Sequence, residues 1–517
     1  MLKREWLPST SAQLRRNVFT ISSTIIVLVF DASFQIQHAK GSPLRHRLLL
    51  LIFFSALLSP VPLTAQHGNS AEIWLTTQDR SQLLTLQSER LAFHPAGSQS
   101  VPASNRIQID DKQTFQTIDG FGFALTGGSA ELIHHMDAAS RHALLQKTFG
   151  KGPNDAGVSY IRVSIGASDM NDHVFTYDDM PSGQSDLSLA HFSLSEDEKD
   201  LIPVLKEILT ISPQLQILAT PWTAPSWMKT NDAPKGGNLK PSLYPVYAAY
   251  LVRYLKSMQS SGIQVATITV QNEPLNPKNT PSMVMESGEE NTFIRDAFGP
   301  AIKRSHLKTR IVLFDHNCNH PDYPIAILND PKTRIFVDGS GFHLYEGEIS
   351  AMSQVHAAFP AKNLYFTEQM VIENKTGEPL APVAEPVSRV VIGAVRNWSR
   401  NVLLWNFAAD PNFGPHTNDG GCPVCQGAVT IDGNAATMNI AFHTIAQVSR
   451  FVSPGSVHIR SSQNDPTLSN AAWRTPSGKH VLVVANTSNA AKDFTIATAN
   501  STASTSLDAG SVATYVW

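Results

Sequence analysis

Eight short apolar segments, alternating with stretches of helical periodicity, constrain the fold of this 517-residue chain more than any other feature. Several of the segments are apolar throughout, which is typical of parallel strands buried on both faces. Helices are expected at Ser242–Ser261, Arg389–Arg400 and Met438–Phe451. Another is expected after Ser195 and Glu198, which have capping-box spacing. The expected strands are Phe121–Leu125, Ser159–Ile165, Gln216–Thr220, Ala266–Gln271, Arg310–Phe314, Gly341–Tyr345, Asn363–Thr367 and Asn401–Phe407.

Eight strand-and-helix units predict an α/β fold, a (β/α)8 TIM barrel with insertions in its loops. A doubly wound open sheet is the competing architecture, and it normally carries a glycine-rich phosphate loop after its first strand. Here Gly120-Phe121-Gly122 begins a strand instead, which disfavours that alternative. Residues 70–112 and 452–517 contain short alternating strands, and both ends together are predicted to form an accessory β-sandwich domain.

A targeting segment is expected ahead of these domains. Arg45-His46-Arg47, Leu48–Leu58 and Leu63-Thr64-Ala65 have the charged, apolar and small-residue parts of a signal peptide, which predicts a secreted, periplasmic or cell-surface protein. Val18–Phe30 is short for a membrane span of about 20 residues, and a membrane anchor is the alternative. No stable membrane span is expected after Gln66. The expected organisation is an export signal or possible anchor at 1–65, N-terminal sandwich strands at 66–115, the catalytic barrel at 116–450 and C-terminal sandwich strands at 451–517.

Charge and cysteine content exclude several classes of protein. With 40 basic and 43 acidic residues and no basic stripe, the chain does not fit a nucleic-acid-binding protein. Three cysteines are too few for a disulfide scaffold. Cys422-Pro-Val-Cys425 has redox or half-zinc spacing, but no partner set accompanies it. A small local disulfide or two unreactive thiols are therefore favoured over a redox or metal centre, and export favours the disulfide of these two.

Two glutamates follow barrel strands that lie across from each other. Functional side chains of such barrels stand at the C-terminal strand ends, and Glu273 follows the fourth expected strand while Glu368 follows the seventh. Their side chains should therefore face one cavity. Paired carboxylates across a cavity are what cleavage of a glycosidic bond requires, one protonated to serve as acid and the other ionised. A barrel that binds sugar without cleaving it is the alternative from another class.

Other strand ends carry residues suited to binding a sugar. Trp222, Trp227 and Trp405 could form a stacking wall, although core aromatic residues are the alternative. A metal barrel would need a second histidine or aspartate cluster at neighbouring strand ends, so neither a metal nor another cofactor is expected. The candidate substrate-binding residues are Arg162, Asp169, Trp222, Asn272, His343, Tyr345 and Trp405.

The ordered set of motifs resembles glycoside hydrolase family 30, the family of glucosylceramidases and β-1,6-glucanases. The resemblance runs from about Ile118 to Val457 and implies a barrel with a β-sandwich. It also implies a retaining mechanism with Glu273 as acid/base, Glu368 as nucleophile and carboxyl groups about 5–5.5 Å apart. The motifs are Asp119-Gly120-Phe121-Gly122, Ser159–Val163, Pro221–Asn231, Gln271-Asn272-Glu273-Pro274, Phe366-Thr367-Glu368 and Leu404-Trp405-Asn406.

The same resemblance implies roles around the carboxylates. Asn272 would hydrogen-bond the sugar 2-hydroxyl. Tyr345 and Arg162 would hold the nucleophile ionised, and Trp222 and Trp405 would bound the −1 sugar site. The rate should be bell-shaped in pH, with its upper limb near pH 6–7 if the pKa of the acid is raised.

One position departs from the pattern of the glucosylceramidases. They carry an acidic residue after the threonine of the first strand loop, whereas this chain has Gly127 in Leu125-Thr126-Gly127-Gly128-Ser129. That form, with His316-Asn317-Cys318 and the Gly420-Gly421-Cys422 loop, resembles bacterial members acting on β-1,6-glucan. A carbohydrate or glycolipid substrate with a β-glucosidic bond, glucan or glucosylceramide, is therefore expected, and a xylan or xyloside is the alternative.

Overall fold

The computed structural model describes residues 70–96, 105–373 and 381–517 of the chain. The predicted signal or anchor at 1–65 lies outside the described residues. Within the described ranges, no helix combines the length and the apolar character needed to cross a membrane.

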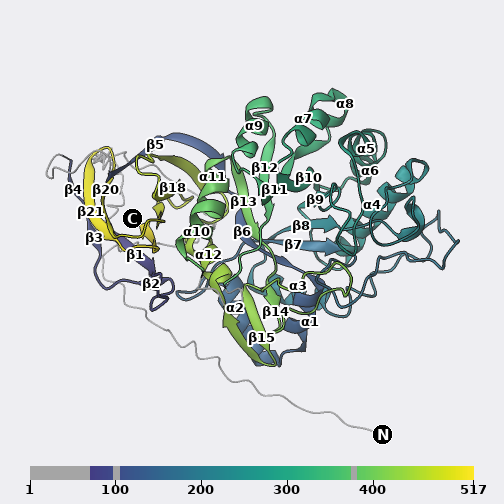
Figure 1. Ribbon diagram of the computed structural model, residues 1–517, viewed down its shortest axis with the longest axis horizontal. Coiled ribbons are helices and arrows are strands. Elements are labelled where there is room, and N and C mark those ends of the chain that lie inside the picture. The colour runs from purple at the N-terminus through teal and green to yellow at the C-terminus, as the bar shows by residue number, and fades with distance from the viewer. Residues whose placement is uncertain (1–69, 97–104, 374–380) are drawn as a thin grey trace, which may run out of the picture. The chain divides into compact units, whose positions relative to one another are not determined.

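The centre of the fold is a closed barrel of eight parallel strands (Figure 1). The strands follow the order of the sequence around the barrel, and β13 pairs with β6 to close it. Every residue of β6 and β7 is buried, including Arg162 of β7, as expected of parallel strands covered on both faces. The predicted TIM barrel is confirmed. Its strands are β6 (Gly120–Leu125), β7 (Tyr160–Ile165), β8 (Gln216–Pro221), β9 (Thr267–Thr269), β10 (Arg310–Cys318), β11 (Val337–Gly347), β12 (Asn363–Glu368) and β13 (Ser399–Leu404).

Helices follow each barrel strand along the chain and cover the outside of the barrel (Figure 1). The loop after β13 carries a small three-stranded sheet of its own, formed by β14 (Ala408–Ala409), β15 (Val429–Asp432) and β16 (Ala435–Met438). The longer helices are α1 (Gly127–His135), α2 (Ala138–Phe149), α3 (Leu201–Ile211), α4 (Tyr244–Ser260), α5 (Ser287–Phe293), α6 (Gly299–Ser305), α7 (Asp322–Asn329), α9 (Ala351–Ala358) and α12 (Ile440–Ser449). Shorter segments are α8 (Pro331–Arg334), α10 (Ala384–Pro386), the π-helical η5 (Val387–Ile392) and α11 (Gly393–Arg396).

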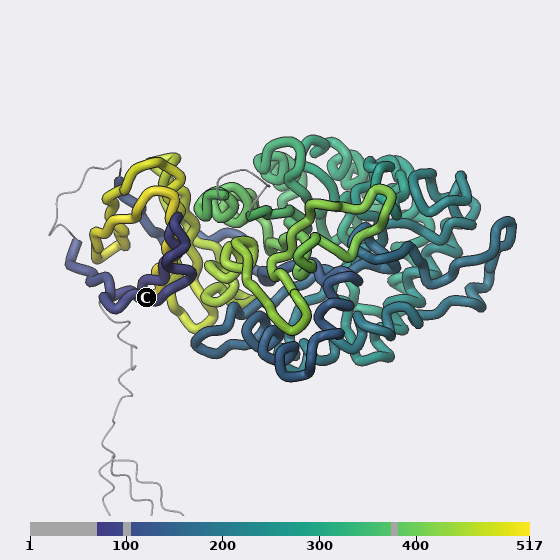
Figure 2. Tube along the Cα trace, turned by 60° about the horizontal axis from the view of Figure 1, so that its bottom comes forward, coloured from purple at the N-terminus to yellow at the C-terminus, as the bar shows by residue number. Residues whose placement is uncertain are grey.

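Strands from both ends of the described chain share an eleven-stranded sheet. β1 pairs with the last strand, β22, and β5 pairs with β17 through most of its length and with β20 at its start. Figures 1 and 2 show the N-terminal strands in purple beside the C-terminal strands in yellow. The domain boundaries expected from the sequence remain predictions. The strands are β1 (Ser70–Thr76), β2 (Thr85–Leu86), β3 (Leu91–Ala92), β4 (His94–Pro95), β5 (Arg106–Thr117), β17 (Val457–Ser461), β18 (Leu468–Arg474), β19 (His480–Asn486), β20 (Lys492–Ala497), β21 (Ser501–Leu507) and β22 (Val512–Val516).

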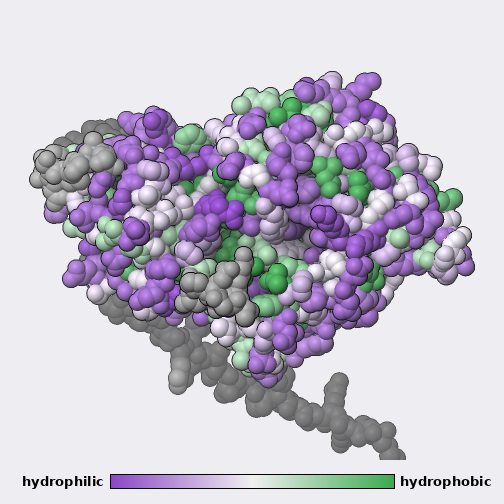
Figure 3. Space-filling model, in the orientation of Figure 1, coloured by the Kyte–Doolittle hydropathy of each residue, from purple (hydrophilic) through white to green (hydrophobic). Residues whose placement is uncertain are grey.

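Buried polar contacts join this sheet to the barrel helices. Gln447 of α12 donates a 2.5 Å hydrogen bond to Thr76 of β1 and accepts one of 2.7 Å from Thr514 of β22. Phe121 of the barrel packs edge-on against Trp473 of the sheet. A buried amide paired at both ends fixes the position of its neighbours, because leaving either partner unpaired would cost free energy. The surface in Figure 3 is mainly hydrophilic, with hydrophobic residues scattered over it.

The expected helix boundaries need two corrections. The predicted capping box is wrong, because α3 begins only at Leu201, after Asp200, and has no side-chain cap. Residues 195–200 form turns instead. The helix expected at Arg389–Arg400 ends at Arg396 with α11, and β13 begins at Ser399. Ser399 and Arg400, which the helical periodicity had included in the helix, belong to the barrel strand instead.

Candidate active site

Glu273 and Glu368 lie at the C-terminal ends of their strands and line one cleft of about 440 Å³. Glu368 is the last residue of β12. Glu273 follows β9 in a left-handed conformation, with φ of 42°, and its backbone N–H donates to the carbonyl of Asp315 at 3.0 Å. That hydrogen bond helps to hold an unfavourable backbone conformation and so aims the side chain into the cleft.

Two donors fix the carboxylate of Glu368. The Arg162 guanidinium donates to Oε2 at 2.5 Å, and the Tyr345 hydroxyl donates to Oε1 at 3.0 Å. The Glu368 side chain is only 8% exposed. Both oxygens are therefore held in place before any substrate enters.

Arg162 lies fully buried beneath the cleft, where it connects three strand ends. Besides Glu368, its guanidinium donates to Asn272 Oδ1 at 2.7 Å and to Asp315 Oδ2 at 2.9 Å. A buried cation needs this many partners to compensate for lost hydration. Because Arg162 occupies the amide oxygen of Asn272, the amide nitrogen remains to donate toward the cleft.

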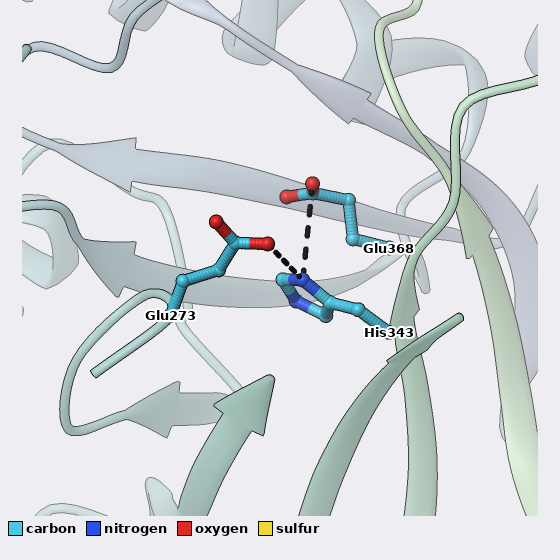
Figure 4. Close-up of side chains that lie close together, drawn as sticks. All are labelled: Glu273, His343 and Glu368. Carbon is cyan, nitrogen blue, oxygen red and sulfur yellow. Dashed lines mark hydrogen bonds and ion pairs between the residues drawn. The ribbon is translucent and has the colours of Figure 1, made fainter. Parts of the chain in front are cut away.

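His343 bridges the two glutamates from below (Figure 4). Its Nδ1 lies 3.1 Å from Glu273 Oε1 and 3.8 Å from Glu368 Oε1, and its Nε2 lies 3.1 Å from Asp315 Oδ1. Burial lowers the pKa of His343, but the charges of Glu368 and Asp315 and the hydrogen bonds to Asp315 and Glu273 outweigh it and raise the pKa to about 9. The imidazole is therefore positively charged at neutral pH.

The two glutamates have pKa values shifted in opposite directions, which the sequence did not indicate. Burial raises the pKa of Glu273, but the hydrogen bond and charge of His343 outweigh it and lower that pKa to about 2. For Glu368, burial and the charge of Glu273 outweigh His343 and Arg162, and the net pKa is raised. The condition for an upper limb near pH 6–7, a raised pKa of Glu273, is therefore not met, because the hydrogen bond and charge of His343 lower that pKa.

Glu273, His343 and Glu368 also form a group that could surround a cation. One ligand atom from each lies within 4.8 Å of the others. Imidazole and carboxylate groups suit zinc or another divalent ion. The Arg162 guanidinium, 2.5 Å from Glu368, already supplies a positive charge there. The expectation that no metal is needed remains a prediction.

Two tryptophans form an apolar wall of the cleft. The rings of Trp222, after β8, and Trp405, after β13, lie 5.5 Å apart, and the Arg162 guanidinium lies 4.8 Å from the Trp222 ring centre. Cys422 and Cys425 line the same cleft as a disulfide and pack with these rings. Trp227, by contrast, faces the core and donates to the carbonyl of Asp178 at 2.9 Å. It is a core aromatic residue rather than part of the wall.

Asp169 provides a third carboxylate in the cleft. Its Oδ1 is buried and has no hydrogen-bond partner among the described residues. Burial, with the charges of Glu368 and Glu273, raises its pKa to about 8. At Gly127, a Cβ atom would lie 1.9 Å from Asn171 Nδ2, so any other residue there would require the Asn171 side chain to move.

The predicted residues come together, and the structure adds others. Asp169, Trp222, Asn272, Glu273, Tyr345, Glu368 and Trp405 line the cleft, while Arg162 and His343 lie beneath it. Sequence reasoning missed Asp315, because it ended the fifth strand at Phe314, whereas β10 continues to Cys318. It also missed Asn276, which donates to Glu273 Oε2 at 2.7 Å. The polar run after Phe314 was the available signal for Asp315.

A parallel barrel with facing carboxylates, sugar-sized aromatic walls and a buried arginine defines the chain as a glycoside hydrolase. The model of the glycosyl hydrolase family 30 TIM-barrel domain matches residues 118–452, and that of the family 30 β-sandwich domain matches residues 455–515. The chain belongs to glycosyl hydrolase family 30.

Relatives in this family are known by activity and by structure. The chain is 32% identical to an endo-1,6-β-D-glucanase of Neurospora crassa, over 76% of this chain and 84% of the relative. It is 28% identical to putative glucosylceramidase 4 of Caenorhabditis elegans, over 70% and 72%. The solved structure of the endo-β1,6-glucanase BT3312 is 32% identical and has a TM-score of 0.79, covering 87% of this chain and 99% of that one.

Replacing Cys422 by Ser should lower stability modestly. The disulfide closes a ring with a sequence separation of only three, so it removes little entropy from the unfolded chain, corresponding to about 2 kcal/mol or less. We expect Cys422→Ser to lower the unfolding temperature by a few degrees, as would adding reductant to the wild type. Complete loss of activity in the variant, with the fold intact, would instead support a thiol or metal role.

Proposed function

We propose that this chain is a retaining hydrolase of β-1,6-linked glucan. The observation that carries the proposal is the spacing of the two carboxylates, which bring one oxygen each to within 4.8 Å. Retaining glycosidases place their carboxyl groups about 5–5.5 Å apart, whereas inverting enzymes leave about 6.5–9.5 Å for a water molecule. A nearest oxygen-to-oxygen distance within 4.8 Å is compatible with the closer, retaining spacing, and this supports direct attack of a carboxylate on the sugar.

In the first step, Glu368 attacks C1 of the sugar and Glu273 protonates the departing oxygen. Arg162 and Tyr345 hold the Glu368 oxygens in place, and a covalent glycosyl ester forms. The proton that Glu273 delivers comes from His343 Nδ1, 3.1 Å away. In the second step, Glu273 takes a proton from water, which attacks C1 and releases Glu368.

The remaining cleft residues are assigned to the sugar bound at C1. Trp222 and Trp405 stack on its ring, and Asn272 donates to its 2-hydroxyl. Asp169 offers an unpaired carboxyl group to the other hydroxyls. Removing a buried hydroxyl partner from such a site leaves polar groups unpaired, so these contacts are expected to select glucose.

The substrate assignment draws on the relatives and on Gly127. Chains named endo-1,6-β-D-glucanase are 30–32% identical to this one, and a side chain in place of Gly127 would displace that of Asn171. Glucosylceramide is the second candidate, because the putative glucosylceramidases of Caenorhabditis elegans also match. Xylan and a barrel that binds sugar without cleaving it are the remaining alternatives.

Product analysis on three substrates tests the proposal. The chain would be incubated with β-1,6-glucan, glucosylceramide and an aryl β-xyloside. Gluco-oligosaccharides from the glucan, with the β-configuration at the new reducing end at early times, are the expected result. Release of ceramide alone would move the assignment to glucosylceramide, and binding of glucan without any product would support the sugar-binding alternative.

The rate should depend on pH through a pair of groups rather than through Glu273 alone. As the pH falls through the raised pKa of Glu368, this carboxylate is protonated and cannot attack. As the pH rises through about 9, His343 loses the proton that it shares with Glu273, and no acid remains. We therefore expect a bell-shaped profile of kcat/KM with its upper limb near pH 9 rather than pH 6–7.

A His343→Gln variant tests whether His343 or Glu273 sets the upper limb of the pH profile. Without the imidazolium, burial raises the pKa of Glu273, which must then hold the proton itself. The upper limb should move to lower pH in the variant. An upper limb at the same pH in both proteins would contradict the sharing of this proton.

We also propose that the chain is exported, on the signal-peptide pattern that ends at Ala65. N-terminal sequencing of protein recovered outside the cytoplasm should begin at Gln66, and an intact N-terminus in the cytoplasm would contradict export.

A further inference from the structure

The cleft has two halves of different chemistry on either side of the catalytic pair. One half comes from the ends of β7, β8 and β13 and includes Asp169, Trp222, Trp405 and the disulfide. The other half comes from the ends of β9, β10 and β11, next to Glu273. Its lining is rich in amide and imidazole groups: Asn276, Asn279, His316, Asn317, Asn319 and His320. Since Glu273 protonates the leaving oxygen in the proposed mechanism, this second half faces the leaving group.

Most amides of this half are already engaged within the protein. Asn276 donates to Glu273, and the Asn317 side-chain oxygen accepts from the backbone N–H of Tyr345 at 2.9 Å. Asn319 donates to Glu346 at 2.7 Å. These contacts shape the wall, but they leave those groups with less capacity for a ligand.

His316 differs from these neighbours. It is 6% exposed and lines the cleft, and its Nδ1 is buried without a hydrogen-bond partner among the described residues. Its ring is held in place by packing, 5.9 Å from Phe314 and edge-on to His343 at 6.4 Å. Burial lowers its pKa to about 4, so the ring is neutral at neutral pH and offers one donor and one acceptor. Buried polar groups are normally paired, and an unpaired one in a cleft wall points to a ligand.

We propose that His316 binds a hydroxyl group of the leaving-group sugar, and that it selects a glucosyl unit over an apolar aglycone at this position. The inference rests on the proposed roles of Glu273 and Glu368 and extends them to the far side of the scissile bond. A ceramide tail would leave the imidazole buried and unpaired, whereas a sugar supplies hydroxyls to it.

Transfer to a sugar acceptor tests this position directly. The glycosyl ester on Glu368 can be attacked by water or by a hydroxyl of added gentiobiose, with Glu273 taking the proton and the Glu368 carboxylate leaving. The acceptor must occupy the leaving-group half. With an aryl β-gentiobioside as donor, the ratio of transfer product to hydrolysis product therefore reports acceptor binding within one reaction, independent of how much enzyme is folded.

His316→Phe keeps the ring packing and removes both nitrogens, so this ratio should fall about tenfold, as for one lost hydrogen bond. His316→Asn should recover part of the loss. The matched control is His443→Phe, in α12 outside the cleft lining, which should leave the ratio unchanged.

Two results would overturn the inference. An unchanged ratio in His316→Phe, with both rates as in the wild type, would show that the ring does not contact the acceptor. An unchanged ratio with both rates lowered equally would show that the ring acts through Glu273 or the fold instead. If the wild type releases no aryl group at all, the proposed hydrolase function is contradicted. That result can be distinguished from the two results for the His316 variant, because both of those require an active wild type.

Discussion

Glu368→Gln should abolish turnover of β-glucosides, with kcat lowered by a factor on the order of 10⁴ or more. The amide has nearly the shape of the carboxylate but cannot form the glycosyl ester. The amide can still accept the hydrogen bond from the Tyr345 hydroxyl. The Arg162 guanidinium loses the anion that lies 2.5 Å away in the wild type and faces a neutral group instead. Product release from the preferred substrate, measured over days, would give the residual rate.

The fold of this variant needs a separate check, because Arg162 is fully buried and loses a charged partner. It keeps Asp315 at 2.9 Å and Asn272 at 2.7 Å, so we expect the protein to fold with some loss of stability. Glu346→Gln is a matched control, since Glu346 lines the same cleft but contacts Asn319 rather than the catalytic pair. Near-normal turnover in Glu368→Gln would exclude this residue as the nucleophile.

The strand-end rule explains why so much of the site could be predicted. In a parallel barrel, a residue at the end of a strand must face the same opening as the ends of all the others. Recognising the strands was therefore enough to bring Glu273 near Glu368, although they lie 95 positions apart in the sequence. Continuous apolar runs made those strands visible, because both of their faces are buried.

The same rule failed where a polar residue lay inside a strand. Asp315 is fully buried within β10, and apolar periodicity ended that strand one residue earlier. The charge of Asp315 is what makes His343 a cation, together with Glu368, and this in turn lowers the pKa of Glu273. Protonation in a cluster of this kind depends on distances of about 3 Å, which no linear pattern encodes.

Glu273→Gln should produce a defect whose size depends on the leaving group. With β-1,6-glucan the departing alcohol needs a proton, and kcat/KM should fall by about 10²–10⁴. With a nitrophenyl glycoside the departing group is stable as an anion, so formation of the glycosyl ester on Glu368 should be affected far less. The ester should then accumulate, because the second step also needs Glu273 to take a proton from water.

Rapid mixing with the nitrophenyl substrate would show a burst of nitrophenol followed by slow turnover, and mass spectrometry would find the sugar on Glu368. The corresponding acid-to-amide substitution at Asp169, which is also a buried carboxyl group in the cleft, provides the contrast. Asp169→Asn should lower kcat/KM for both substrates by a similar factor, because the proposed role of Asp169 is to bind the sugar and not the leaving oxygen. Equal defects on glucan and nitrophenyl substrate in Glu273→Gln would contradict its role as acid and base. Such a result would turn attention to His343, whose Nδ1 lies 3.8 Å from Glu368 Oε1.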